Sequence, residues 1–232
     1  MIKFNGKDII PRFNGKDVSR VMYNGKQIYP SNKGIDPATA PNGVYVYSND
    51  GKLYNPDDWD TANNDSAIGV AVITDDCKFA ITKEEKPRRA WSIALYGTDV
   101  SGLTNYDSSS QPETDFNGES NTSIIREAAS SEDSSNNAAH YCYSQTVSIN
   151  GRGTIHGYLP ALGELQVAHD NKAAIYSAMS LIGGTAIPTS YALWSSTESD
   201  SSLAWSFGWV NGNPDRAYTD STYYSVPIFS LD

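Results

Sequence analysis

The side chains that most often carry enzymatic chemistry are few and widely spaced in this chain. Its three histidines, His140, His156 and His169, occur in none of the H-x-x-x-H or H-E-x-x-H patterns that bring two imidazoles onto one metal ion. The sequence has no G-x-S-x-G nucleophile turn, no P-loop and no glycine-rich turn opening a helix. We therefore expect a protein that is not an enzyme and that carries no cofactor.

The remaining candidate ligands and nucleophiles are the cysteines and the acidic pairs. Cys77 and Cys142 are too few for a disulfide framework or a four-ligand zinc site. One bridge between them is an alternative, but two buried thiols are the simpler expectation. The segment from Asp57 to Asp65 has acids and asparagines suited to calcium but lacks EF-hand spacing. Neighbouring acids elsewhere are typical of solvated turns, so we expect no metal site.

The charge of the chain is unevenly distributed. The 232 residues include 17 Lys and Arg against 27 Asp and Glu, a formal net charge of −10. Residues 1–33 carry +5, from seven basic and two acidic residues, which leaves −15 for the remainder. Because an acidic surface repels a phosphate backbone, we expect no nucleic-acid partner.

Neither a membrane span nor a signal peptide is expected. The longest apolar run, Ala67 to Ile73, is far shorter than the ~20 residues that cross a bilayer. The N-terminus has a charge and a turn where a signal peptide needs an apolar stretch. The sequence predicts a soluble chain made in a cytoplasm, without membrane insertion.

Residues 190–225 differ from the rest of the chain in the residue types they use. They contain no Lys, Gln or Met and a single Glu, yet eight aromatic residues and nine serines. Tyr supplies rigid contact area and Ser supplies adaptable hydrogen bonding, a composition typical of a paratope. A serine-rich sheet edge with its aromatic residues in the core has the same composition, so the two interpretations stay open on composition alone.

Strand alternation separates these two interpretations in part. Within residues 205–210 the large aromatic side chains share one face, which we expect to be the core: Trp205, Phe207 and Trp209. The other face, which we expect to be exposed, carries Ser206, Gly208 and Val210. We expect the segment from Asn211 to Thr222 to be an exposed loop.

The N-terminal residues 1–33 form a repeat of three similar segments: Phe4-Asn-Gly-Lys-Asp-Ile9, Phe13-Asn-Gly-Lys-Asp-Val18 and Tyr23-Asn-Gly-Lys-Gln-Ile28. Asn-Gly between aromatic and β-branched residues is a strong hairpin signal. A head of short hairpins buries too little surface to be stable alone. We expect it to pack on its own main domain, to dock on a partner or to assemble with copies of itself, and we expect a linker over residues 34–42.

The body, residues 43–232, has an α+β pattern. Strands are expected over 44–47, 52–54, 68–73, 79–81, 192–194, 203–209 and 223–229. Between them, residues 98–139 are polar, with a short helix over Thr122 to Ala129. One helix is predicted over residues 161–168 and a second from Lys172 to Ile182, which Gly183 ends. The order is strands, helices and strands, rather than a parallel βαβ series.

Several segments of the body resemble a known family. Gly157-Tyr-Leu-Pro-Ala-Leu-Gly-Glu-Leu165, Ser180-Leu-Ile-Gly-Gly-Thr-Ala-Ile187, Trp194-Ser-Ser-Thr-Glu198, Ala204-Trp205 and Trp209-Val-Asn-Gly212 are similar to the variable proteins of diversity-generating retroelements. These include the major tropism determinants of phages. The resemblance covers about residues 40–232 and implies a C-type lectin fold, in the variant shared with formylglycine-generating enzymes.

In that family an error-prone reverse transcriptase rewrites a C-terminal repeat and mutates template adenines. The missing residue types of 190–225 fit such rewriting, and the resemblance implies a variable region over about 190–228. It also implies a fixed scaffold: Trp194, Ser195, Ser196, Thr197, Ala204, Trp205, Phe207, Trp209, Gly212, Tyr224 and Pro227. The ending Ser225-Val-Pro-Ile228 departs from the family, which has an Arg there, so the register of the last strand is left open.

By the same resemblance, the remaining positions of the variable region are implied to face a ligand. They are Ala192, Leu193, Asp200, Ser202, Leu203, Ser206, Gly208, Val210, Asn211, Asn213, Asp215, Arg216, Ala217, Tyr218, Asp220, Ser221, Thr222 and Tyr223.

The implied function is a phage or prophage receptor-binding adhesin. Its variable surface would bind a bacterial surface protein or glycan. The head, which is similar to repeats of phage tail-associated proteins, would attach to a tail or baseplate protein or form a homo-oligomer, a trimer. The expected location is the virion tail.

Two alternatives are kept. Asn213-Pro-Asp215 is similar to a motif of calcium-dependent carbohydrate-binding lectins, although the partner Trp-Asn-Asp motif is missing. An enzyme related to the sulfatase-activating oxidases would need a reactive cysteine pair, which has no counterpart in the C-terminal segment. Substitution of Cys77 and Cys142 by Ser would test that alternative.

Overall fold

The computed structural model describes residues 34–107 and 111–231, and within residues 1–33 it gives the backbone of six short strands. These pair two by two in antiparallel fashion, with Phe4 opposite Lys7, Phe13 opposite Lys16 and Tyr23 opposite Lys26. The strands are β1 (Ile2–Phe4), β2 (Lys7–Ile9), β3 (Arg12–Phe13), β4 (Lys16–Asp17), β5 (Val21–Tyr23) and β6 (Lys26–Tyr29). The predicted strand repeat is confirmed, while the turn residues lie outside the described residues.

The first sheet of the body is antiparallel, in the order β18-β10-β9-β7-β8. Its strands are β7 (Gly43–Ser48), β8 (Leu53–Tyr54), β9 (Ala67–Ile73), β10 (Lys78–Thr82) and β18 (Ile228–Ser230). Every residue of the central strand β9 is buried, as its continuous apolar run predicts. The last strand pairs with β10, Ile228 opposite Ile81, which fixes its register.

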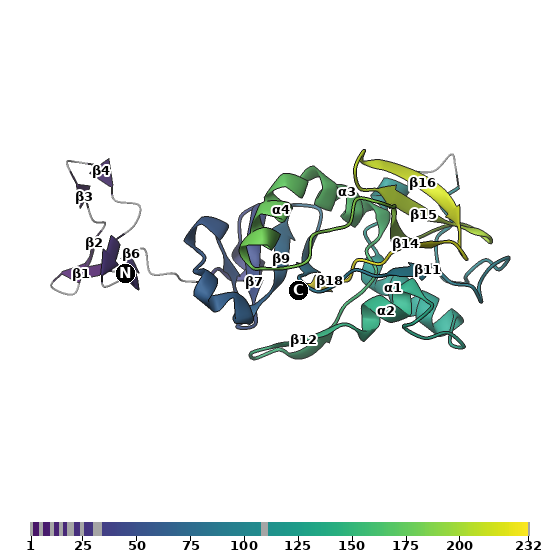
Figure 1. The fold of residues 1–232 in the computed structure, drawn as a ribbon, viewed down its shortest axis with the longest axis horizontal. Helices are drawn as coiled ribbons and strands as arrows, with labels where there is room; N and C mark the ends of the chain where they lie inside the picture. Colours follow the sequence, from purple (N-terminus) through teal and green to yellow (C-terminus); the bar gives the residue numbers. More distant parts are fainter. Residues whose placement is uncertain are drawn as a thin grey trace.

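The second sheet has the order β11-β17-β14-β15-β16, with one parallel pair, β14 with β17. Its strands are β11 (Arg88–Ala90), β14 (Leu193–Asp200), β15 (Leu203–Gly208), β16 (Asn213–Tyr218) and β17 (Thr222–Tyr224). The single strand expected over 223–229 is two strands, since residues 225–227 cross from this sheet to the first. Figure 1 shows the two sheets side by side along the long axis of the body.

Within residues 34–107 and 111–231, four helices connect and cover the sheets: α1 (Gly118–Ala128), α2 (Ala138–Ser144), α3 (Leu162–Asp170) and α4 (Lys172–Leu181). Short 3-10 helices lie at Pro37–Thr39, Pro56–Asp58, Thr61–Ser66 and Pro112–Thr114. A separate hairpin pairs β12 (Thr146–Ile149) with β13 (Gly153–His156). The two helices predicted near residues 161–182 are confirmed. Gly183 has a φ of 68°, the left-handed conformation that ends a helix.

Apolar side chains gather in three clusters. The first lies between the two sheets and includes α3 and α4, with Ile175, Met179 and Ile182 all buried. The second lies on the other face of the second sheet, under α1, α2 and the segment after β11. The third covers the other face of the first sheet and includes Ile149 of β12. Both faces of each sheet are therefore covered, in an α+β arrangement of antiparallel sheets (Figure 1).

Two parts of the body differ from the sequence expectation. Asn213–Tyr218 is a strand rather than a loop, because pairing with β15 outweighs its low strand propensity. Residues 34–42, expected to be a linker, are attached to the body: the Ile35 and Leu53 backbones exchange two hydrogen bonds, and Lys52 pairs with Asp36 at 2.8 Å.

Candidate functional site

The tryptophans of the second sheet form its internal framework. Trp194, Trp205 and Trp209 are all buried, and Phe207 is fully buried beside them. Each indole N–H has a partner, which a buried indole needs: the Arg89 carbonyl for Trp194, the Tyr106 carbonyl for Trp205 and the Tyr176 hydroxyl for Trp209. The prediction that the aromatic face of β15 lies in the core is confirmed.

The polar residues of β14 are also buried, from Ser195 to Ser199. The Thr197 hydroxyl donates to Asp115 Oδ2 at 2.8 Å and accepts the Leu162 N–H at 3.0 Å. The Ser195 hydroxyl donates to the Trp205 carbonyl at 2.7 Å. Hydrogen-bonded polar groups are tolerated in a core because their lost hydration is replaced. Ser195 thus ties β14 to β15, and Thr197 ties β14 to α3 and to the segment before α1.

Gly212, expected to be fixed, is required by two features of its backbone. Its φ is 72°, a conformation that side chains rarely adopt. A Cβ there would lie 2.6 Å from the ring of His169, which also packs edge-on against Trp209 at 5.5 Å. His169 at the end of α3 thus supports the turn between β15 and β16.

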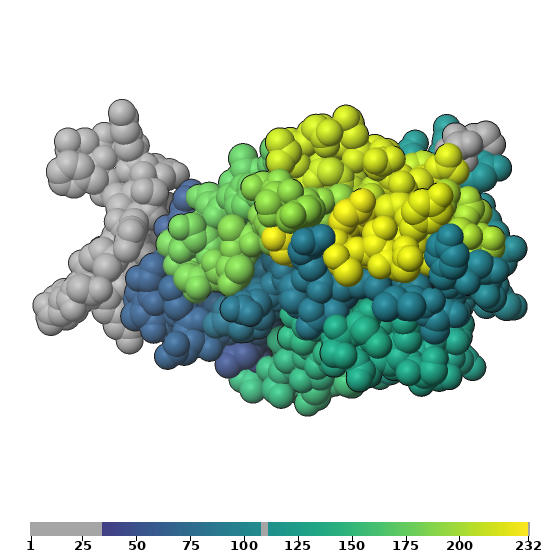
Figure 2. Space-filling model, turned by 45° about the vertical axis from the view of Figure 1, so that its right-hand side comes forward, coloured from purple at the N-terminus to yellow at the C-terminus, as the bar shows by residue number. Residues whose placement is uncertain are grey.

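The eighteen predicted ligand-facing residues divide into three groups by burial. Eight are exposed, and seven of these lie on β16 or the turns beside it: Val210, Asn211, Asn213, Asp215, Arg216, Tyr218 and Asp220, with Thr222 on β17. Seven are half-buried: Ala192, Asp200, Ser202, Leu203, Gly208, Ser221 and Tyr223. Figure 2 shows the C-terminal segment, in yellow, gathered over one face of the body.

The third group corrects the sequence expectation, since Leu193, Ser206 and Ala217 are buried and do not face solvent. Leu193 belongs to the core between the sheets, and Ala217 to the core under α1 and α2. Ser206 is 1% exposed, and its hydroxyl donates to the Asp215 carbonyl. The alternation argument failed at Ser206 because both faces of β15 are covered, which a strand pattern does not reveal.

The structure adds a segment to this surface that the sequence did not indicate. The loop after β11 places Ile93 and Tyr96 in solvent, 56% and 51% exposed, and the Tyr96 ring lies 6.1 Å from that of Tyr218. The Ser92 N–H donates to the Thr219 carbonyl at 3.0 Å. No local pattern marked this segment, because Trp91 and Ile93 would share one face of a strand, yet Trp91 is buried and Ile93 is exposed.

The outer edge of β16 is partly closed by its own side chains. Asp215 Oδ1 accepts the Arg216 backbone N–H at 2.8 Å, and Pro214 has no N–H to offer. Such features protect a sheet edge from strand addition. The surface is therefore suited to contact through side chains rather than through backbone pairing.

A cavity of about 510 Å³ lies elsewhere, beside Glu164 and Tyr158 at the start of α1. Burial raises the pKa of Glu164 to about 8, even though the Tyr158 hydroxyl and the Ala161 N–H both donate to its carboxyl group. Cys77 also lines this cavity, and burial raises its pKa to about 12. A thiol that is protonated at neutral pH is a poor nucleophile.

Cys77 and Cys142 are both free thiols in different regions of the fold; Cys142 is buried as expected, whereas Cys77 is half-buried. Within residues 34–107 and 111–231, no group of three or more His, Cys, Asp or Glu side chains is arranged to hold a metal ion. Among the described helices, none is long and apolar enough to cross a membrane.

Comparison with known proteins gives one structural likeness. No family model matches the sequence, and no curated protein matches it. The fold is similar to that of a fimbrial protein from Bacteroides ovatus, with a TM-score of 0.60 at 15% sequence identity. The match covers 82% of this chain and 49% of that protein, so the chain spans about half of its length. At this identity the likeness concerns the fold alone.

Proposed function

We propose that this chain is a phage or prophage receptor-binding adhesin whose C-terminal surface, diversified by a retroelement, binds a bacterial surface ligand. One observation carries the proposal. The segment that lacks Lys, Gln and Met forms a sheet whose tryptophans are buried, while most of the residues on its outer strand β16 are exposed. A buried framework beneath exposed Tyr, Asn and Asp side chains is the arrangement that lets contact residues change without loss of the fold.

The proposal includes the C-type lectin fold, in the formylglycine-generating-enzyme-like variant, for residues 43–232. It is supported by two neighbouring antiparallel sheets, by the return of the last strand β18 to the first sheet, and by the two helices packed between them. The segment Gly157 to Leu165, which carries the resemblance, leads into α3, and Trp194 to Glu198 forms β14.

The head, residues 1–33, is proposed to attach the adhesin to a tail or baseplate protein and to form a trimer in the virion tail. Three separate two-stranded hairpins support this role, because an isolated hairpin is marginally stable and gains stability by packing on a partner. Light scattering of the full chain and of residues 34–232 tests the trimer. We expect the mass per particle to fall to that of one chain when the head is removed, and an unchanged mass would contradict this role.

Receptor binding is tested with the fluorescently labelled full chain on a panel of intact bacterial strains. We expect saturable binding to some strains, weakened about tenfold or more by the combined variant Arg216→Ser and Tyr218→Ser, since a few residues carry most of the energy of an interface. Ser148→Lys, an exposed change on the β12–β13 hairpin, is the matched control and should leave binding unchanged. Absence of binding to every strain would contradict the proposal.

Two further measurements separate the proposal from its alternatives. Binding that requires calcium and is lost in EDTA would favour the carbohydrate-binding lectin. Sequencing of the neighbouring DNA should find a near-identical copy of the codons for residues 190–230 beside a reverse transcriptase gene. Independent isolates that differ throughout the chain, rather than in this segment, would argue against diversification.

A further inference from the structure

Building on the proposed function, we infer that the receptor is a protein with an apolar, neutral-to-basic contact area. We further infer that the loop Ser92–Leu103, outside the variable segment, supplies part of the surface that binds it. This surface, called here the composite face, consists of Ile93, Tyr96 and Tyr218 with the exposed residues of β16.

The distribution of exposed apolar side chains identifies the composite face. Among the described residues, the large hydrophobic side chains that are exposed are Ile93, Tyr96, Tyr191, Val210 and Tyr218. The rings of Tyr96 and Tyr218 are in contact, and Ile93 lies on the same loop as Tyr96. Val210 precedes the opposite end of β16, and Tyr191 precedes β14. Exposed apolar groups that lie together among polar residues mark interaction sites in soluble proteins.

The loop is anchored to the core by its own buried side chains. Trp91, Leu95 and Val100 are buried in the core under α1 and α2, which turns Ile93 and Tyr96 outward. The Trp91 indole N–H donates to the Ser195 carbonyl of β14 at 2.9 Å. A contact surface ordered before binding pays less conformational entropy when the partner arrives.

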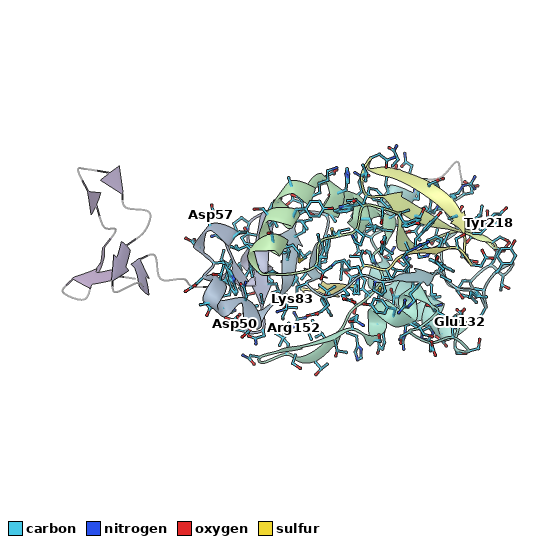
Figure 3. All side chains as sticks on the ribbon, viewed as in Figure 1. Asp50, Asp57, Lys83, Glu132, Arg152 and Tyr218 are labelled. Atoms are coloured by element: carbon cyan, nitrogen blue, oxygen red, sulfur yellow. The ribbon has the colours of Figure 1, made fainter. Side chains whose placement is uncertain are left out.

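Glu132, between α1 and α2, fixes the part of the loop that carries Ile93. Its Oε1 accepts the Ile93 N–H at 2.8 Å and the Ala94 N–H at 3.1 Å. Its Oε2 accepts the Ser92 hydroxyl and the Asn137 side-chain N–H. Figure 3 shows Glu132 and Tyr218 at the same end of the body, far from Asp50 and Asp57. Because Glu132 acts through the loop, we assign it as a positioning residue.

The chemistry of the composite face favours a protein over a glycan. Ile93 presents a branched aliphatic group, which finds a matching partner in apolar protein side chains rather than in hydroxyl-covered sugars. Tyr, Ser, Asn and Asp around them match the composition of protein-binding paratopes. The charge of −15 outside the head disfavours anionic surface polysaccharides and favours a neutral or basic receptor surface.

The first experiment uses cells of a strain that binds the labelled full chain. One portion is treated with proteinase K and another with sodium periodate, which destroys vicinal diols of glycans. We expect proteinase K to remove binding, periodate to leave it, and added NaCl to weaken it. Binding that survives proteinase K and is lost after periodate overturns this inference alone, whereas failure to bind any strain overturns the proposed function and this inference with it.

The second experiment tests the loop. Ile93→Ser and Tyr96→Ser should each weaken cell binding about tenfold, the loss expected of residues near an interface centre, while Ser148→Lys binds like the parent. Parent-like binding by both loop variants overturns the role of the loop.

Glu132→Ala removes the acceptor of the Ile93 and Ala94 amides, so it should expose them to hydrogen exchange and weaken binding, with the other amides of the second sheet protected as before. Glu132→Gln keeps one acceptor oxygen, and protection and binding closer to the parent in that variant would support positioning through this side chain. Loss of amide protection without loss of binding would show that the loop lies outside the contact.

Discussion

Strands β14 and β16 belong to the same sheet, are both rich in polar residues, and have opposite environments. In β14 every residue from Leu193 to Ser199 is buried, and in β16 all residues except Ala217 are exposed. Between them lies β15, hydrogen-bonded to both. The two strands show that a polar strand can be either the interior framework of a sheet or its display surface.

The difference arises from long-range partners. The hydroxyls of β14 form hydrogen bonds with Asp115, the Leu162 N–H and the Trp205 carbonyl. The side chains of β16, in contrast, lie at the open edge of the sheet. Buried hydroxyls are costly without such partners, so β14 tolerates few substitutions. Residues at the edge make few contacts, so β16 should tolerate many.

The largest expected effect is on the buried strand. Thr197→Val leaves the buried Leu162 N–H without its acceptor, which costs about 1–3 kcal/mol, and removes one donor to Asp115, whose Oδ2 keeps the Asn121 side-chain N–H. We expect the free energy of unfolding, measured by urea denaturation, to fall by about 2 kcal/mol. A fall below about 0.5 kcal/mol, the range of surface changes, would remove the distinction between the two strands.

The second-largest expected effect concerns Glu198, near the C-terminal end of β14. Its Oε1 accepts the Val100 N–H at 3.0 Å, and its Oε2 is buried without a hydrogen-bond partner. Burial, with the nearby charges of Asp99 and Asp200, raises its pKa from 4.5 to about 7. The folded state therefore holds the proton more tightly, so the stabilisation is complete below pH 4.5 and is lost as the pH rises through 7.

We expect Glu198→Gln to flatten part of the fall in stability between pH 4.5 and 7, by about 1 kcal/mol or more, because the unfolded state releases this proton near pH 4.5 and the folded state near pH 7. Urea denaturation at a series of pH values measures this. The remaining slope should extend to pH 8, because burial raises the pKa of Glu164 to about 8. An unchanged pH profile of stability in Glu198→Gln would mean that another group causes the fall between pH 4.5 and 7.

The smallest expected effect is on β16 and the turn that precedes it. The triple variant Val210→Ser, Arg216→Ser and Tyr218→Ser should change the free energy of unfolding by less than about 1.5 kcal/mol, since each surface change is worth about 0.5 kcal/mol or less. Thermal unfolding followed by circular dichroism measures it. A loss comparable to that of Thr197→Val would mean that β16 is part of the framework.

Local sequence patterns determined much of the fold. The spacing of Ile175, Met179 and Ile182 predicts α4, and the Asn-Gly repeats predict the short paired strands of residues 1–33. The alternation of Trp205, Phe207 and Trp209 identifies the core face of β15. These features depend on neighbours two to four residues apart, which a sequence displays directly.

Tertiary structure alone decided which polar residues are buried and which segments share a surface. Asp115, the partner of Thr197, lies 82 residues earlier in the chain, and Tyr96 meets Tyr218 from a different part of the fold. Ser206 is buried on the face of β15 that alternation assigned to solvent, and Ala204 of the same strand belongs to the core under α1 and α2. Burial depends on which distant elements meet, and a strand pattern describes only the faces of one element.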